Sequence, residues 1–162
     1  MVTYNDVSGI LREWAENVIV HIQDNLDSTG TTASGKTKDS LRYEIDGDEF
    51  SQSLKIYGRQ YFQGVEEGRG PGRVPYKFQD ILYDWAQAKG ILANFGDTER
   101  KQRSVLYMVG KSIKENGTRL YQDGGRLDIY SNVLNEELPK LEDNVSFFLK
   151  QSIAEIFNNE NN

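Results

Sequence analysis

The chain contains no cysteine, and it has one histidine and three prolines among 162 residues. Without cysteine, disulfides, thiolate metal sites and thiol catalysis are all excluded. The single histidine, His21, has no second histidine for a histidine-based metal centre, and its place at the edge of a predicted helix stripe favours a helix-surface residue over a member of a catalytic triad. The paired acids Glu136 and Glu137 indicate a solvated helix face. We therefore expect no catalytic residue, no metal site and no cofactor.

Long apolar runs and excess positive charge are also missing. No segment approaches the roughly 20 apolar residues of a membrane span, so no membrane association is expected. The formal net charge is −6, whereas dedicated nucleic-acid-binding proteins usually carry a basic balance. The sequence therefore favours a protein that lets DNA pass without binding it sequence-specifically.

One stretch, "GTTASGKT" from Gly30 to Thr37, matches the phosphate-binding pattern G-x-x-x-x-G-K-[ST]. In a true P-loop, Lys36 would reach the β/γ-phosphates and Thr37 would bind magnesium. That chemistry needs a buried strand before the loop and a helix directly after it. The flanking patterns predict a helix before and a strand after, which favours a flexible loop over residues 28–38.

The helix before this loop is predicted from an apolar stripe with three- and four-residue steps. Asn5 or Asp6 is expected to cap it. The stripe consists of Val7, Ile10, Leu11, Trp14, Val18, Ile22 and Leu26.

A two-stranded hairpin is predicted after the loop, from two segments of alternating apolar and polar residues. Leu41, Tyr43 and Ile45 are expected on one face, with Leu54 and Ile56 facing them from the partner strand. The turn between the strands is acidic and comprises Asp46, Gly47, Asp48 and Glu49.

Glycine and proline then interrupt regular structure from Gly68 to Pro75. We expect an exposed, shaped loop here, and such loops commonly carry contacts. Its centre is Arg69, Gly70, Pro71, Gly72 and Arg73.

Three further helices are predicted downstream. The first turns Ile81, Trp85 and Ala88 inward and ends near Gly90. The second is capped by Asp97, ends at Gly117, and presents Leu106, Val109 and Ile113. The last begins near Pro139, and its stripe is Leu141, Val145, Phe148, Leu149, Ile153 and Ile156.

The fold class is therefore α+β: a single domain over 1–162, with a small antiparallel sheet packed by the N-terminal and later helices, and a frayed tail at about 158–162.

The order of these elements resembles the tail-completion or neck proteins of long-tailed bacteriophages. The resemblance rests on "SGKTKDSLRYEI" (Ser34 to Ile45), "YFQGVEEGRGPGRVPY" (Tyr61 to Tyr76) and "ILYDWAQAKGI" (Ile81 to Ile91), with "IKENGTRLY" (Ile113 to Tyr121) after them. The family often has two adjacent prolines before its tryptophan-containing helix, whereas here Pro75 is followed by Tyr76.

This resemblance implies a virion structural protein, assembled in the host bacterial cytoplasm, that forms a homo-oligomeric ring between capsid and tail around the DNA channel. Its partners would be copies of itself and neighbouring neck and tail proteins. Because ring assembly joins two different surfaces, the loop Arg69–Arg73 could contact Asp46, Asp48 and Glu49 of a neighbour. Two alternatives stay open: a nucleotide-binding phosphotransferase using the GTTASGKT loop, and a small adaptor domain that binds a host protein.

Overall fold

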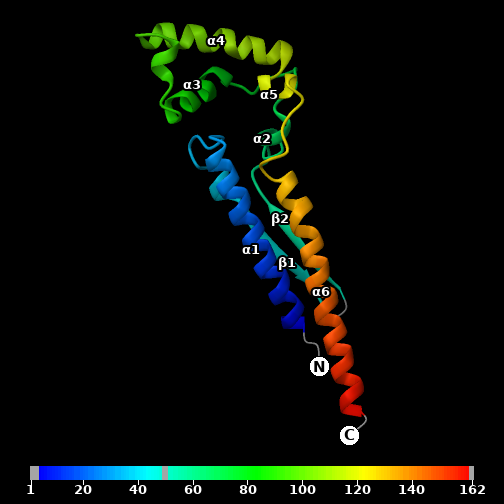
Figure 1. The fold of residues 1–162 in the computed structure, drawn as a ribbon. Helices are drawn as coiled ribbons and strands as arrows, with labels where there is room; N and C mark the ends of the chain where they lie inside the picture. The colour runs from blue at the N-terminus through cyan, green and yellow to red at the C-terminus, as the bar shows by residue number, and fades with distance from the viewer. Residues whose placement is uncertain (1–3, 49–50, 161–162) are drawn as a thin grey trace. The chain divides into compact units, whose positions relative to one another are not determined.

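The structure, a computed structural model, describes residues 4–48 and 51–160 and has an α+β fold. Its long helices are α1 (Tyr4–Ser28), α3 (Phe78–Ala88), α4 (Glu99–Asn116) and α6 (Ser131–Glu160) (Figure 1). Short helices are α2 (Gly64–Glu67) and α5 (Arg119–Gln122), with 3-10 turns η1 (Lys38–Ser40) and η2 (Leu92–Phe95). The strands are β1 (Arg42–Gly47) and β2 (Gln52–Tyr57).

The chain divides into two compact units, each discontinuous in sequence. The first comprises Met1–Asn25, Ser40–Gly58 and Asp128–Asn162, and the second comprises Leu26–Asp39 and Arg59–Leu127. The single domain over 1–162 stays a prediction.

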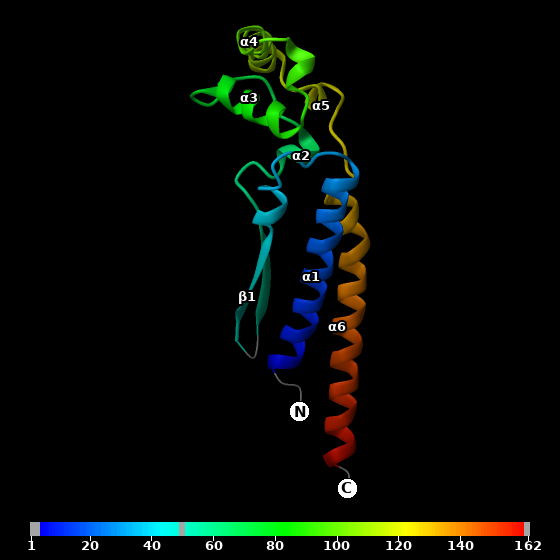
Figure 2. The ribbon, with the colours of Figure 1, turned by 90° about the vertical axis from the view of Figure 1, so that its left-hand side faces the viewer.

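In the first unit, α1 and α6 lie side by side and antiparallel, and the β1–β2 hairpin packs against α1 (Figure 2). The predicted stripe of α1 is buried at Leu11, Trp14, Val18 and Ile22. The predicted cap is wrong, because Asn5 and Asp6 lie inside the helix.

The hairpin has the predicted strands, and its continuous antiparallel register pairs Tyr43 with Ile56 and Ile45 with Leu54. These four side chains are half-buried, while the residues between them are mostly exposed. Two contacts join the hairpin to α1. The Tyr43 hydroxyl donates to Glu16 at 2.8 Å, and the Ser8 hydroxyl donates to Gln52 at 3.3 Å.

The last helix begins eight residues earlier than predicted, since α6 starts at Ser131 and contains Pro139 in its interior. Because proline favours the first turn of a helix, Pro139 predicts the N-terminus of the last helix at that position. The segment before it is nonetheless anchored, because Ile129 and Val133 are buried. Packing therefore offsets the roughly 3 kcal/mol that an interior proline costs. The sequence predicts a frayed tail from about residue 158, but α6 continues as a helix to Glu160. Residues 161–162 lie outside the described range.

In the second unit, α3 packs on α4 around buried Leu82, Ala86 and Leu106. The prediction that Ile81, Trp85 and Ala88 face inward is wrong: Trp85 is 42% exposed, and Ile81 and Ala88 are exposed as well.

The reason for this shift lies on α4. At Gly110, an added Cβ would lie 3.3 Å from Leu82 and 3.4 Å from Phe78. The missing side chain therefore lets the stripe that contains Phe78 and Leu82 approach α4 closely, and Trp85 turns outward.

Helix α4 itself confirms the prediction at Leu106, Val109 and Ile113, which belong to this core. It ends at Gly117 as expected, but Thr98 is the cap rather than Asp97, since its side chain accepts from the Lys101 N–H. No helix or strand occurs from Gly68 to Pro75, which confirms the predicted loop.

Candidate functional site

The GTTASGKT stretch follows the end of helix α1 and leads into a single 3-10 turn, η1, and then strand β1, not into an α-helix. The N–H groups of Thr31 and Thr32 donate to the Leu26 carbonyl at 3.0 and 3.1 Å, and the Gly30 N–H donates to the Asp27 carbonyl at 3.0 Å. Gly30 has a φ of +64°, the left-handed geometry that commonly follows a helix. Three N–H groups at the start of this stretch, those of Gly30, Thr31 and Thr32, are therefore used to satisfy the last carbonyls of α1.

The carbonyl groups of the same loop converge on a cation that the chain supplies. The Lys89 ammonium donates to the Gly30 carbonyl and, at 2.7 Å, to the Thr32 carbonyl. Carbonyl oxygens and the negative end of a helix dipole attract cations and repel phosphate. Lys36, the residue that a P-loop would use, is exposed. The predicted order of helix, loop and strand is confirmed, and Lys89 is a contact that the sequence analysis missed.

A small polar cluster fixes the start of this loop. Asp27 accepts hydrogen bonds from the Lys38 ammonium and, at 2.7 Å, from the Thr32 hydroxyl. The Lys38 bond, followed by that from Thr32, lowers the pKa of the Asp27 carboxyl below its ordinary value. The loop predicted to be flexible over residues 28–38 is thus held at several points by named bonds.

The two arginines of the loop Arg69–Arg73 occupy different environments. The Arg69 N–H donates to the Thr118 hydroxyl at 2.9 Å, and the Thr118 N–H donates to the Arg69 carbonyl at 2.8 Å. The Arg69 guanidinium donates to the Arg73 carbonyl and lies 5.8 Å from the centre of the Phe78 ring. Arg69 therefore holds the loop in shape from a half-buried position, whereas the Arg73 side chain is exposed.

The residues between these arginines also contact the segment around α5. The Gly72 N–H donates to the Lys114 carbonyl at 2.9 Å, and a Cβ on Gly70 would lie 3.3 Å from the Tyr121 ring. Pro71 is exposed. The predicted contact loop is thus a shaped surface whose exposed residues are Pro71, Gly72 and Arg73.

The acidic residues predicted to face this loop in a neighbour belong to the hairpin of the first unit. Asp46 lies in β1 and pairs with Lys55 of β2 at 2.8 Å. This hydrogen bond raises the pKa of the Lys55 ammonium. Asp48 accepts from the Ser51 N–H at 3.0 Å, and Glu49 lies outside the described residues. Asp46 is exposed and Asp48 is exposed, so both remain accessible to a partner.

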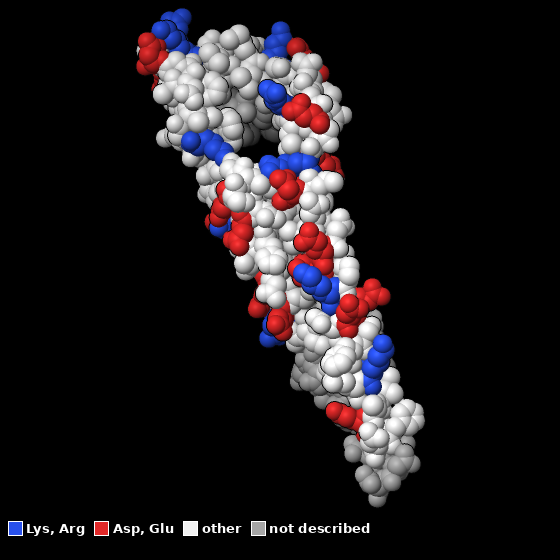
Figure 3. All heavy atoms as spheres, viewed as in Figure 1, with Lys and Arg blue, Asp and Glu red and all other residues white. Residues whose placement is uncertain are grey.

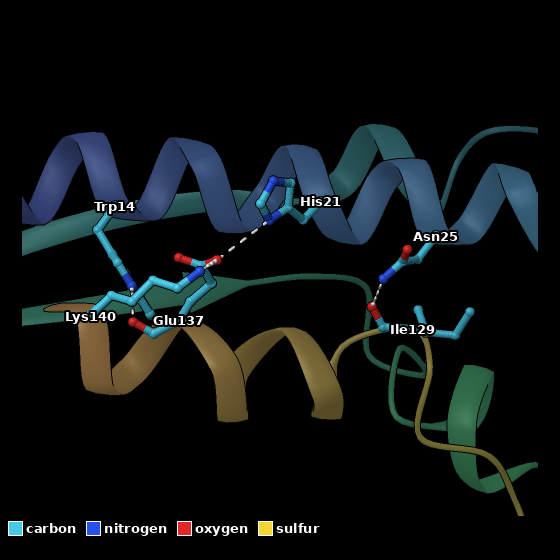
Figure 4. Close-up of polar contacts among 6 residues, drawn as sticks. All are labelled: Trp14, His21, Asn25, Ile129, Glu137 and Lys140. Atoms are coloured by element: carbon cyan, nitrogen blue, oxygen red, sulfur yellow. Dashed lines mark hydrogen bonds and ion pairs between the residues drawn. The ribbon is translucent and has the colours of Figure 1, made fainter.

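Helices α1 and α6 are joined by polar contacts around Glu137 (Figure 4). The Trp14 indole N–H donates to the Glu137 backbone carbonyl at 2.8 Å. The Glu137 carboxylate pairs with Lys140 at 2.7 Å and lies 3.9 Å from His21 Nδ1. The prediction of a solvated Glu137 is wrong, because its side chain is only 13% exposed. Further along the pair, the Asn25 side-chain amide donates to the Ile129 carbonyl at 3.1 Å.

Apolar side chains remain exposed along one line of α6. Leu149 is 41% exposed and Ile153 is 53% exposed, although the sequence predicts both in the packed stripe. Leu138, about three turns before Leu149, is exposed too, and it borders an open hollow of about 550 Å³ that Leu11 and Val145 also line. In the face that Figure 3 shows, acidic and basic side chains are interspersed along the part of the surface that α6 forms.

The second unit has a further hollow of about 570 Å³ between the start of α3 and α4. Tyr76 and Tyr107 line it with exposed rings, and Lys77, Lys111 and Lys114 are among its other side chains. The sequence analysis missed this hollow, because its two tyrosines are 31 positions apart in the printed numbering and no pattern connects them.

The described residues contain neither a cluster suited to a metal ion nor a helix suited to span a membrane. Within 4–48 and 51–160, no group of three or more His, Cys, Asp or Glu side chains is arranged to hold a metal ion. Over the same residues, no helix combines the length and apolar character needed to span a membrane.

Comparison with known proteins returned no match: no family model, no curated protein and no solved structure corresponds to this chain.

Proposed function

We propose that this chain is a virion structural protein of a tailed bacteriophage: a neck or tail-completion subunit that forms a ring and joins capsid to tail around the DNA channel. The phage assignment rests on the sequence resemblance. The observation in the structure that supports self-assembly is the exposed apolar line Leu138, Leu149 and Ile153 on α6.

These three residues share one side of the helix, because eleven residues make about three helical turns and four make about one. In the packed stripe next to them, Leu141, Val145 and Phe148 are half-buried. The apolar surface of α6 is thus wider than the surface that the rest of the described unit covers. Exposed apolar surface of this kind, here interrupted by the exposed Glu142, commonly marks an interface with another molecule.

The GTTASGKT loop supports this proposal over a phosphotransferase. Its N–H groups cap α1 and its carbonyls bind Lys89. A nucleotide phosphate would have to displace both sets of bonds and then face carbonyl oxygens. The proposal therefore gives the loop a structural role and the chain no catalytic step.

The first test is the oligomeric state of the purified chain, measured by native mass spectrometry and electron microscopy. Ring-shaped particles are expected. Leu149→Glu combined with Ile153→Glu should leave a folded monomer and remove the rings, because both residues are exposed within the chain. Asn144→Glu combined with Gln151→Glu is the matched control, since both residues are also exposed on α6 and the pair adds the same two charges without removing apolar surface.

The second test is complementation of a phage whose own copy of this gene is disrupted. Unjoined heads and tails are expected without the protein, and joined virions with the wild-type chain. A chain that is monomeric at every concentration and absent from purified virions would contradict the proposal, and capture of a host protein by that monomer would favour the adaptor alternative.

A further inference from the structure

The two-stranded sheet has two open edges. The Asp48 N–H donates to the Ser51 carbonyl at 2.9 Å and closes the hairpin. In an antiparallel ladder, hydrogen-bonded and non-hydrogen-bonded pairs alternate. Counting from Asp48 and Ser51 through the unbroken register, every second residue turns its N–H and C=O away from the partner strand. These residues are Tyr43 and Ile45 on β1 and Leu54 and Ile56 on β2.

None of these outward backbone groups bonds to another backbone group within the described part of the chain. Natural proteins usually protect such edges with proline, a β-bulge or a covering element. Neither β1 nor β2 contains proline, and their register has no bulge. Figure 2 shows β1 in front of β2 along its length, with no other element in front of its outer edge and α1 beside the hairpin. Because two-stranded sheets are marginal in isolation, the edges are suited to accept a further strand.

The charges on the outer face differ between the two edges. β1 carries Glu44 and Asp46 together with Arg42, whereas β2 carries Lys55 and no acid. Lys55 lies opposite Glu44 in the register and pairs with Asp46 at 2.8 Å. Two β1 edges paired antiparallel about Glu44 would place the two Glu44 carboxylates opposite each other, with Arg42 opposite Asp46 on either side. A β1 edge and a β2 edge would repeat the favourable pairing found within the hairpin.

We infer that a second copy of this chain adds its β2 strand, antiparallel, to the outer edge of β1. In the register of the hairpin, Ile45 then exchanges backbone hydrogen bonds with Leu54 of the second copy. Glu44 lies opposite Lys55 of the second copy in a non-hydrogen-bonded pair, where side chains are closest. The apolar side chains of both copies then lie on the same face of the extended sheet, which is the face that α1 covers.

This pairing is head-to-tail, because the donor and acceptor edges differ, and head-to-tail contacts build rings when their rotation closes. The inference therefore rests on the proposed ring-forming function and specifies which surfaces meet. It also gives the charged residues Glu44 and Lys55, on the outer face of the hairpin, a role in joining two copies.

The absence of cysteine allows a direct test by cross-linking. One chain carries Glu44→Cys and another carries Lys55→Cys, so neither can form a disulfide within itself at this pair. After mixing and mild oxidation, we expect a disulfide-linked dimer that contains one copy of each variant. Either variant alone should give little dimer. The control mixes Lys55→Cys with Glu13→Cys, which places the second thiol at an exposed position on α1.

A charge exchange provides a second, independent readout. Glu44→Lys alone and Lys55→Glu alone should each fail to assemble, since each places like charges across the interface. An equal mixture of the two should assemble, because every Glu44→Lys edge then meets a Lys55→Glu edge. Restoration by mixing cannot come from the hairpin within one chain, which stays mismatched in both variants.

Rings without the mixed disulfide and without restoration by mixing would overturn the edge pairing and leave the proposed function intact. Failure of the wild-type chain to form any oligomer, in solution or in virions, would overturn both. Circular dichroism of each variant establishes that it is folded before it is scored.

Discussion

The indole N–H of Trp14 donates a 2.8 Å hydrogen bond to the backbone carbonyl of Glu137, a residue 123 positions later in the chain. This bond joins α1 to α6 within the first unit, and Trp14 is buried at the contact. The carbonyl lies two residues before Pro139, in the part of α6 that the sequence does not predict to be helical. The tryptophan therefore combines apolar burial with a polar bond that fixes the register of the two helices.

Replacing Trp14 with phenylalanine should separate these two contributions. Trp14→Phe keeps most of the buried ring but removes the N–H donor, and an internal hydrogen bond contributes about 0.5–1.5 kcal/mol. We expect a loss of about 1 kcal/mol in the free energy of unfolding, with Trp14→Ala costing about 3–5 kcal/mol. Urea denaturation measures both. Equal losses in the two variants would mean that the ring contributes nothing beyond the bond.

Trp85 should behave in the opposite way. Because Trp85 is 42% exposed, Trp85→Ala should change the free energy of unfolding by about 1 kcal/mol or less. Leu82→Ala is the matched comparison on the same helix, and it should cost about 2–5 kcal/mol because Leu82 is buried against α4. Chemical denaturation of the isolated chain distinguishes the two. A large loss for Trp85→Ala would place its ring in the core after all.

Trp85 and Leu82 show which part of the packing can be predicted from the sequence. Apolar periodicity located helix α3, but two stripes of α3 are apolar, and only Gly110 on another helix decides which one is packed. By contrast, the predicted stripe of α1 is buried from Leu11 to Leu26, although Ala15 and Ile19 are buried beside it and were not predicted. The apolar face of the hairpin is predictable because alternation has a period of two, so a shift by one residue would expose every apolar side chain.

The candidate surfaces were less predictable. Lys89 binds the carbonyls of a loop 57 and 59 residues earlier, and no local pattern encodes such a contact. Leu149 and Ile153 were placed in the packed stripe because α6 is apolar around more of its circumference than one neighbouring helix covers. The open strand edges follow from the absence of a third strand among the described residues, which only the fold reveals.

The Lys89 contact should control the order of the GTTASGKT loop. Lys89→Met removes the donor to the Gly30 and Thr32 carbonyls, so amide hydrogen exchange over residues 29–37 should become faster. Lys36→Met is the control, because Lys36 is exposed and its replacement should change stability by no more than about 0.5 kcal/mol. Hydrogen-exchange mass spectrometry measures both. Tight magnesium-ATP binding that disappears in Lys36→Met would contradict the structural role of the loop.

The Asp27 cluster predicts a pH dependence for the same loop. Bonds from Lys38 and Thr32 hold the pKa of the Asp27 carboxyl below its ordinary value of 3.8. Their contribution to stability is therefore fully present above pH 3.8 and is lost as the pH falls through the lowered pKa. Carboxyl-carbon NMR should give an Asp27 midpoint below 3.8, and Lys38→Met should move it upward. An unchanged midpoint in Lys38→Met would show that Lys38 does not stabilise the carboxylate.

The loop Arg69–Arg73 should give different results at its two arginines. Arg73 is exposed, so Arg73→Glu should leave the chain folded. If Arg73 contacts a carboxylate of a neighbouring subunit, the reversal should block incorporation into particles, because losing a buried charged partner at an interface costs about 2–5 kcal/mol. Arg69→Ala should instead destabilise the chain itself by about 1–2 kcal/mol, since it removes an internal hydrogen bond and a cation–π contact. Phage complementation, scored for unjoined heads and tails, tests the first, and thermal unfolding tests the second. Normal infectivity from Arg73→Glu would show that the arginine is solvated in the virion, whatever the stability of the Arg69 variant.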